Sequence, residues 1–250
     1  MAPWMLALLA GLVAGGALLL GSAIAWWVEV PRAVVAGIMA FGAGVLISAL
    51  TLELVSDALE QGGLAPTAGG FLAGAVVYVG LNILLARHGA GHRKRSGDQQ
   101  TSEQEHSGSG GAIAIGALLD GVPESMVLGL SVLAGPGLSV PMFAAVFISN
   151  VPEGLSSSAG WKRAGRSRRY VFGIWAAIAL ASGLASLAGF ALLDGAPPAA
   201  LSVVNALAAG AILAMIADTM IPEAFAEESL YTGLVATLGF LAALTLHAMG

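Results

Sequence analysis

The sequence alternates long apolar runs with short polar breaks. An α-helix needs about 20 apolar residues to cross the hydrocarbon core of a bilayer, and eight runs reach that length. In chain order, these runs cover approximately residues 3–28, 33–57, 66–86, 112–133, 141–160, 170–193, 199–221 and 230–249. The pattern predicts an all-α polytopic membrane protein, with eight transmembrane helices in one domain that covers residues 1–250.

Composition favours a membrane location. Hydrophobic residues make up 57% of the chain and charged residues only 10%, whereas a soluble domain carries roughly a quarter of charged residues. We therefore expect the lipid bilayer as a partner, and no nucleic-acid partner. The chain contains no cysteine, so disulfides and thiolate metal sites are excluded, while oxygen and nitrogen ligands remain.

The basic residues predict the orientation of the chain. All ten Lys and Arg residues fall in the breaks that follow the first, third and fifth runs, namely Arg32, residues 87–95 and residues 162–169. These breaks share one side of the membrane, which the positive-inside rule identifies as the cytoplasm. The expected localisation is a plasma or inner membrane, crossed several times, with both termini outside the cytoplasm.

A polar linker, residues 87–111, separates the third run from the fourth. It is rich in Ser, Gln and Gly and contains His88, His92 and His106. This composition predicts a flexible cytoplasmic loop. His88 and His92 are four residues apart and would share one helix face as metal ligands; the alternative is that the histidines are solvated linker residues.

Two Pro-Glu motifs lie inside the fourth and fifth runs. Asp120 and Glu124 are four residues apart, as are Ser149 and Glu153, so each pair shares one face of its helix. Both pairs lie about halfway along their runs, and a short break joins the two helices, so we expect the motifs to face each other near the bilayer midplane. Together with Asn150 they would form an oxygen-rich cation site, because intramembrane acids are costly and usually functional.

Further acids lie near the two ends of the predicted path. Glu53 and Asp57 end the second run on the outer side, while Asp218 and Glu223 end the seventh run toward the cytoplasm. Acids at three depths describe a path for a cation across the membrane. The alternative is structural: the outer acids would also suit a solvated helix end, the midplane acids a hydrogen-bonded bundle core, and Ser149 a close helix contact.

The motifs resemble those of the ZIP family of zinc- and iron-regulated divalent metal transporters. The resemblance rests on residues 120–125 (DGVPES), 149–154 (SNVPEG) and 218–224 (DTMIPEA), and the eight runs and the histidine-containing loop extend it over the whole chain. It implies a 3+2+3 arrangement of helices with inverted repeats and a binuclear metal site between the fourth and fifth helices. It also makes a homodimer a candidate assembly.

The sequence departs from the family pattern at this site. Asp120 and Ser149 stand where the family has histidines, Gly121 stands where it usually has asparagine, and the sixth run has no carboxylate. Oxygen ligands therefore predominate, which moves the expected preference from zinc toward manganese or iron(II). We expect one complete metal site rather than two.

Two functions of different classes follow. The first is a transporter that moves a divalent cation (zinc, iron or manganese) toward the cytoplasm, without a resident cofactor. Its metal ligands would be nine residues at three depths: Asp120, Glu124, Asn150, Glu153, Ser149, Asp218, Glu223, Glu53 and Asp57. The second is a ZIP-like membrane protein that binds or senses metal or a partner without transporting it. An intramembrane enzyme with paired carboxylates is a third class, but the sequence has no nucleophile triad, zinc-hydrolase motif or nucleotide-binding loop, so we do not expect an enzyme.

Overall fold

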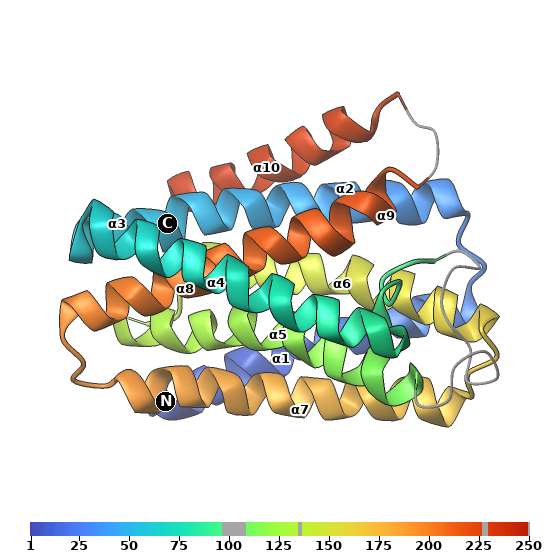
Figure 1. The fold of residues 1–250 in the computed structure, drawn as a ribbon, viewed down its shortest axis with the longest axis horizontal. Helices are drawn as coiled ribbons and strands as arrows, with labels where there is room; N and C mark the ends of the chain where they lie inside the picture. Colours follow the sequence, from blue (N-terminus) through green and yellow to red (C-terminus); the bar gives the residue numbers. More distant parts are fainter. Residues whose placement is uncertain (97–108, 135–136, 227–229, 250) are drawn as a thin grey trace.

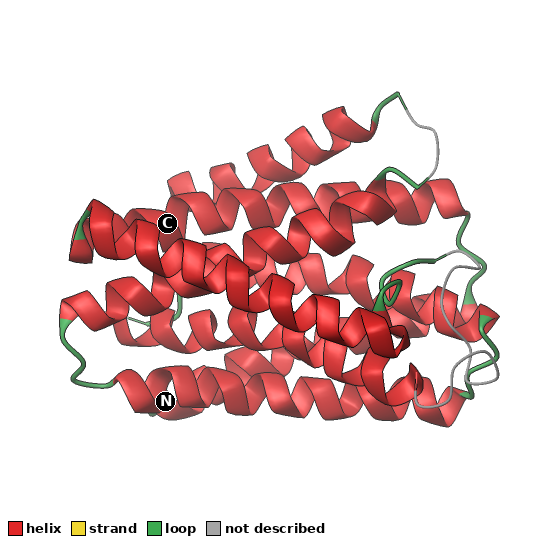
Figure 2. Cartoon of the chain, viewed as in Figure 1, coloured by secondary structure: helices red, strands yellow, loops and turns green. Residues whose placement is uncertain are grey.

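A computed structural model describes residues 1–96, 109–134, 137–226 and 230–249, and within these ranges every regular element is helical (Figure 2). The helices are α1 (Pro3–Trp27), α2 (Arg32–Ala49), η1 (Leu50–Val55), α3 (Ser56–Gly62), α4 (Leu64–Leu85), η2 (Ala86–Ala90), α5 (Ser109–Ala134), α6 (Val140–Arg163), α7 (Arg168–Leu193), α8 (Pro198–Met215), η3 (Ile216–Met220), α9 (Ile221–Ala224) and α10 (Thr232–Met249). The elements η1, η2 and η3 are π-helical turns. Each follows directly on an α-helix, so the second, third and seventh predicted spans are compound helices.

The helices are long and apolar enough for a membrane. Seven continuous helical stretches in the described residues meet both criteria. The eighth long helix, α6, has 24 residues but carries Asn150, Glu153 and a basic end, which lower its hydropathy. The all-α prediction is therefore confirmed, and the helices are consistent with a polytopic membrane protein; seven of the eight predicted spans meet both criteria.

The long helices lie side by side along the long axis of the molecule (Figure 1). Both termini lie at one end of the bundle, and the connections that carry Arg32, residues 87–95 and residues 162–169 lie at the other, here called the basic end. The most extensive packing joins α1 with α6 and α7, α5 with α7, α4 with α8, and α2 with α10.

Glycines bring these helix backbones into contact. A Cβ added at Gly129 of α5 would lie 1.8 Å from the carbonyl oxygen of Ser186 in α7, and one added at Gly189 of α7 would lie 2.3 Å from that of Met126. The same close approach joins other helices: Gly21 and Gly154 (α1 with α6), Gly11 against Ser182 (α1 with α7), Gly44 and Gly239 (α2 with α10), and Gly74 and Gly210 (α4 with α8). Small residues allow such packing where lipid removes any hydrophobic drive between helices.

The predicted linker is structured at both of its ends. Residues 87–90 belong to η2, and residues 109–111 begin α5. After η2 the chain turns inward, so that Arg93 and Lys94 are each only 2% exposed. Residues 87–96 therefore have defined contacts with the bundle, whereas His106 lies outside the described residues.

Candidate cation site

Three acids from two helices lie in the interior of the bundle. Asp120 and Glu124 of α5 are each 1% exposed, and Glu153 of α6 is 4% exposed. Pro123 and Pro152 lie inside continuous helices beside them. At 1.5 Å of rise per residue, the acids lie roughly 15–22 Å from the basic end, in the middle of the bundle.

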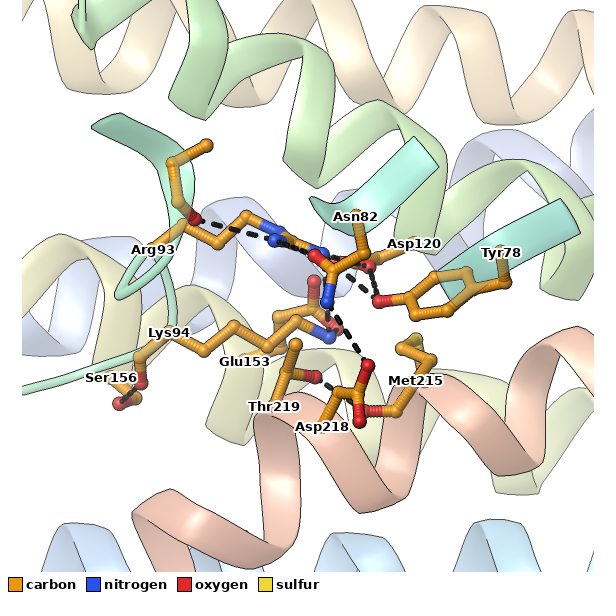
Figure 3. A network of polar contacts seen from close by, with 11 residues as sticks. Tyr78, Asn82, Arg93, Lys94, Asp120, Glu153, Ser156, Met215, Asp218 and Thr219 are labelled. Atoms are coloured by element: carbon orange, nitrogen blue, oxygen red, sulfur yellow. Dashed lines mark hydrogen bonds and ion pairs between the residues drawn. The ribbon is translucent and has the colours of Figure 1, made fainter. Parts of the chain in front are cut away.

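Arg93 binds the Asp120 carboxylate through two parallel hydrogen bonds. Its Nε donates to Oδ2 at 2.9 Å and its Nη2 donates to Oδ1 at 2.8 Å (Figure 3). The hydroxyl of Tyr78 in α4 donates to the same Oδ1 at 2.6 Å and accepts from Arg93 Nη2 at 2.9 Å. A guanidinium fits a carboxylate in this forked geometry better than any other cationic side chain does, because both its donors are fixed in one plane.

Lys94 bridges the acids of the two helices. Its Nζ lies 2.8 Å from Glu153 Oε2 and 3.4 Å from Asp120 Oδ2 (Figure 3). Burial alone would lower the pKa of the Lys94 ammonium, but Asp120, Glu153 and Glu124 together raise the pKa above its ordinary value. One buried lysine side chain is thus shared by carboxylates of α5 and α6.

The end of the inward turn, residues 91–96, is held by Glu223 of α9. Oε1 of Glu223 accepts from the Ser96 amide at 2.9 Å, from the Ser156 hydroxyl at 3.1 Å and also from the Ser96 hydroxyl. Oε2 of Glu223 lies 3.8 Å from Arg95 Nη1. The carbonyl of Lys94 lies within hydrogen-bond distance of the same Ser156 hydroxyl, whose single proton is shared between the two acceptors. We call residues 91–96 the cationic segment, since it places Arg93, Lys94 and Arg95 against acids of three helices.

Asp218 connects to the same network through an amide. Asn82 of α4 donates to Asp218 Oδ2 at 3.1 Å and accepts from Arg93 Nη1 at 2.7 Å (Figure 3). Asp218 lies on η3, where the π-helical turn interrupts the α-helical spacing of the seventh span. The structure thus links Asp218 and Glu223 to the central acids by way of the cationic segment.

Glu124 differs from its neighbours. Both carboxylate oxygens are buried and have no hydrogen-bond partner in the described part of the chain. The side chain lies within electrostatic range of Glu153, Lys94 and Asp120. An unsatisfied buried carboxylate is expensive, and among the three central acids Glu124 is the one without a hydrogen bond or ion pair in the described residues.

Ser149 and Asn150 precede Glu153 on α6 and bond to backbone carbonyls. Ser149 donates to the carbonyl of Val146 at 3.0 Å, one turn back in its own helix. Asn150 donates to the carbonyl of Ala14 in α1 at 2.8 Å. Neither side-chain hydrogen bond reaches the central acids, so the ligand role of these two residues stays a prediction.

The outer acids form a separate group. Oε1 of Glu53 lies 2.6 Å from Nδ1 of His247, and its Oε2 accepts from the Ser139 hydroxyl at 3.0 Å. Asp57 lines a small pocket with Glu53 and Asn205. Sequence reasoning found no partner for His247, because Glu53 lies at the opposite end of the sequence. Glu227 and Glu228 lie outside the described residues.

The predicted ligands do not form a ready metal cluster. Across the described ranges, no three His, Cys, Asp or Glu side chains come together in a way that could hold a metal ion. His88, for example, bonds to the carbonyl of Leu84 in its own helix at 2.9 Å. Instead, Arg93 and Lys94 occupy the positions that face the acids, so the site holds cations that belong to the chain.

Four residues of this site were not predicted from the sequence. Tyr78 and Asn82 are polar, four apart and inside the third apolar run, which is the same signal that singled out Asp120 and Glu124. Arg93 and Lys94 stand in a polar, glycine- and serine-rich stretch that gives no sign of burial.

No model of a known protein family matches the chain, and a search of curated proteins finds no match either.

Proposed function

We propose that this protein is a transporter that moves a divalent metal cation across a membrane toward the cytoplasm. The observation that carries the proposal is the ammonium of Lys94, which Asp120 and Glu153 share at the centre of the bundle. Carboxylates of two helices that converge on one cation also suit a metal ion of double charge once the lysine has left. Glu124, buried beside them without a partner in the described residues, supplies a further oxygen ligand.

The helix pairing supports an inverted repeat of the ZIP type as part of this proposal. A two-fold operation that exchanges the first three spans with the last three, and the fourth with the fifth, turns the α1–α6 contact into α7–α5. It likewise turns α4–α8 into α10–α2, and all four contacts are extensive. The turns η1 and η3 fall in the two spans that this operation exchanges. A binding site on the fourth and fifth spans then lies where the repeats meet, as in many secondary transporters.

The described conformation corresponds to a closed state in this mechanism. The cationic segment enters from the basic end, which the positive-inside rule places in the cytoplasm, with both termini outside. The metal replaces Lys94 between Asp120 and Glu153, and the segment must then withdraw before the metal can leave toward the cytoplasm. With oxygen ligands alone, manganese or iron(II) is the expected substrate, ahead of zinc.

Metal uptake by cells tests the proposal. Cells that express the wild-type protein should accumulate one or more of manganese, iron and zinc above the level of cells without it, as measured by elemental analysis. Glu124→Ala and Glu153→Ala should abolish this excess at equal protein abundance in the membrane. Asp194→Ala, which removes an exposed carboxylate at the end of α7, should leave uptake unchanged. Unaltered uptake in both central variants would exclude the mechanism.

One observation favours a second function, a membrane protein that binds or senses metal or a partner without transport. Arg93 and Lys94 already neutralise Asp120 and Glu153, and a permanently neutralised site has no need of a metal. Titration of the purified protein with manganese, iron(II) and zinc, beside flux into proteoliposomes, separates the two functions. Stoichiometric binding without flux supports the sensor, and flux abolished by Glu153→Ala supports the transporter.

A further inference from the structure

A cavity lies at the basic end of the bundle, apart from the central acids. It has a volume of about 550 Å³ and is bordered by the end of α1, the connection to α2 and the end of α6. Its lining residues are Ala25, Val28, Glu29, Val30, Pro31, Arg32, Leu155, Ala159, Lys162 and Arg163. In the described residues none of them forms a hydrogen bond or ion pair with Asp120, Glu124 or Glu153, although Arg163 reaches the cationic segment at the carbonyl of Ser96.

The cavity is apolar inside and cationic at its mouth. Ala25 and Leu155 are buried at its floor, while the side chains of Arg32, Lys162 and Arg163 are exposed. Glu29 is the only acid among the lining residues, so the cavity carries three positive charges against one negative charge. This combination suits a ligand with an anionic head and an apolar body.

Lys162 and Arg163 of α6 have more N–H donors than their described hydrogen bonds use. Lys162 donates to the carbonyl of Trp26 at 2.9 Å, and Arg163 donates to the carbonyl of Ser96. Both acceptors are uncharged, and the ion pairs of the described residues include neither side chain. An ammonium has three N–H donors and a guanidinium has five, so each can also bind an oxyanion.

Aromatic rings place the cavity at the depth of lipid headgroups. Lys162 Nζ lies 5.7 Å from the centroid of the Trp26 ring, and the Arg168 guanidinium lies 4.7 Å from that of Trp27. Phe172 packs against both tryptophans. Tryptophans beside Lys and Arg are typical of the membrane–water interface.

We propose that this cavity binds the phosphate of an anionic phospholipid, with Arg32, Lys162 and Arg163 around the phosphate and the start of the acyl chains against Leu155 and Ala25. Basic pockets between transmembrane helices are a recurrent site for acidic headgroups on the cytoplasmic side. The apolar floor favours a lipid over free phosphate, because inorganic phosphate would leave that surface uncovered. The proposal does not depend on what the central site carries.

The test is to titrate the protein, purified in a nonionic detergent, with lipid and to measure its melting temperature at each lipid concentration. Phosphatidylglycerol should raise the melting temperature in a saturable way, and phosphatidylcholine and inorganic phosphate should not. The double variant Lys162→Gln, Arg163→Gln should weaken the apparent affinity for phosphatidylglycerol roughly tenfold or more. Arg169→Gln removes an exposed charge at the same end but outside the cavity, and should retain wild-type affinity.

A second variant keeps the test decisive if the double variant does not fold. Glu29→Gln removes the one acid of the cavity and should tighten the binding of phosphatidylglycerol. Equal responses to phosphatidylglycerol and phosphatidylcholine would overturn the proposal, as would a response to inorganic phosphate alone. Wild-type affinity in the double variant, or weaker affinity in Glu29→Gln, would also overturn it.

Discussion

Lys94 and Glu153 form an ion pair in the interior of the bundle, with 2.8 Å between Nζ and Oε2, although the chain reaches Lys94 only after it has left α4 and η2. The pair thus joins a connecting segment to the middle of a transmembrane helix. A lysine that can leave with its segment is a removable cation, unlike a lysine fixed on a helix. If the proposed transport of a metal cation is correct, Lys94 and the metal must compete for the same carboxylates.

Replacing Lys94 should destabilise the metal-free protein and sensitise it to metal. In Lys94→Met, Glu153 and Asp120 lose a shared buried cation, and removal of one partner from a buried pair costs about 3–5 kcal/mol. Added manganese should then raise the melting temperature of the variant more than that of the wild type, because binding to the folded state stabilises it by mass action. Arg169→Met, at an exposed arginine of the same end of the bundle, should change neither quantity. A variant with the melting temperature and metal response of the wild type would contradict competition.

The hydroxyl of Tyr78 should contribute measurably to the closed state. Tyr78→Phe keeps the buried ring but removes the donor to Asp120 Oδ1 and the acceptor for Arg93. We expect a loss of about 1–2 kcal/mol in the free energy of unfolding, the usual range for a buried hydrogen bond of this kind. Unfolding of the variant and the wild type in mixed micelles measures the difference. Equal stabilities would show that water or another group replaces the hydroxyl.

Glu223 should control how firmly the cationic segment is held. Glu223→Ala removes the acceptor of the Ser96 amide and the ion-pair partner of Arg95. We expect the amides of residues 94–96 to exchange hydrogen at least about tenfold faster, because local opening then costs roughly 1.4 kcal/mol less. Glu60→Ala, at the exposed end of α3, provides the control. Unchanged exchange would mean that Arg93 and Lys94 alone hold the segment.

The glycine contacts should be intolerant of a single methyl group. Gly129→Ala places a Cβ 1.8 Å from the Ser186 carbonyl oxygen, and the helices must move apart at a cost of about 1–3 kcal/mol. Gly173→Ala on α7 meets no atom within 4 Å and should be neutral or stabilising by up to about 1 kcal/mol, because alanine favours a helix. The free energy of unfolding in mixed micelles distinguishes the two. Equal effects at the two positions would refute the packing argument.

Much of the architecture could be predicted from the sequence, because a bilayer restricts a chain to a few choices. Apolar length identified the spans, and helical spacing placed Asp120 and Glu124 on one buried face. The π-helical turns could not be predicted, since they depend on packing against neighbouring helices. The burial of Arg93 and Lys94 could not be predicted either. The composition of a segment does not show that acids of other helices lie where the segment can contact them.

The pairing of Glu53 with His247 illustrates a different limit. These residues are 194 positions apart, and no local pattern connects them. Their contact follows from the packing of α10 against α2, which the glycines at positions 44 and 239 make close. Local rules therefore found the polar residues of this protein but could not tell which of them meet.

The close backbone contacts at glycines also group the helices into units that would move together. Contacts of α1 with α6 and α7, and of α7 with α5, join α1, α5, α6 and α7 into one block. This block carries Asp120, Glu124 and Glu153. Tyr78 belongs to α4, and Lys94 follows α4 and η2 in the chain, so both residues lie outside that block. A motion of α4 relative to this block would therefore carry the three acids as a unit. It would have to break the contacts that Tyr78, Arg93 and Lys94 make with these acids, so those three residues together would resist it.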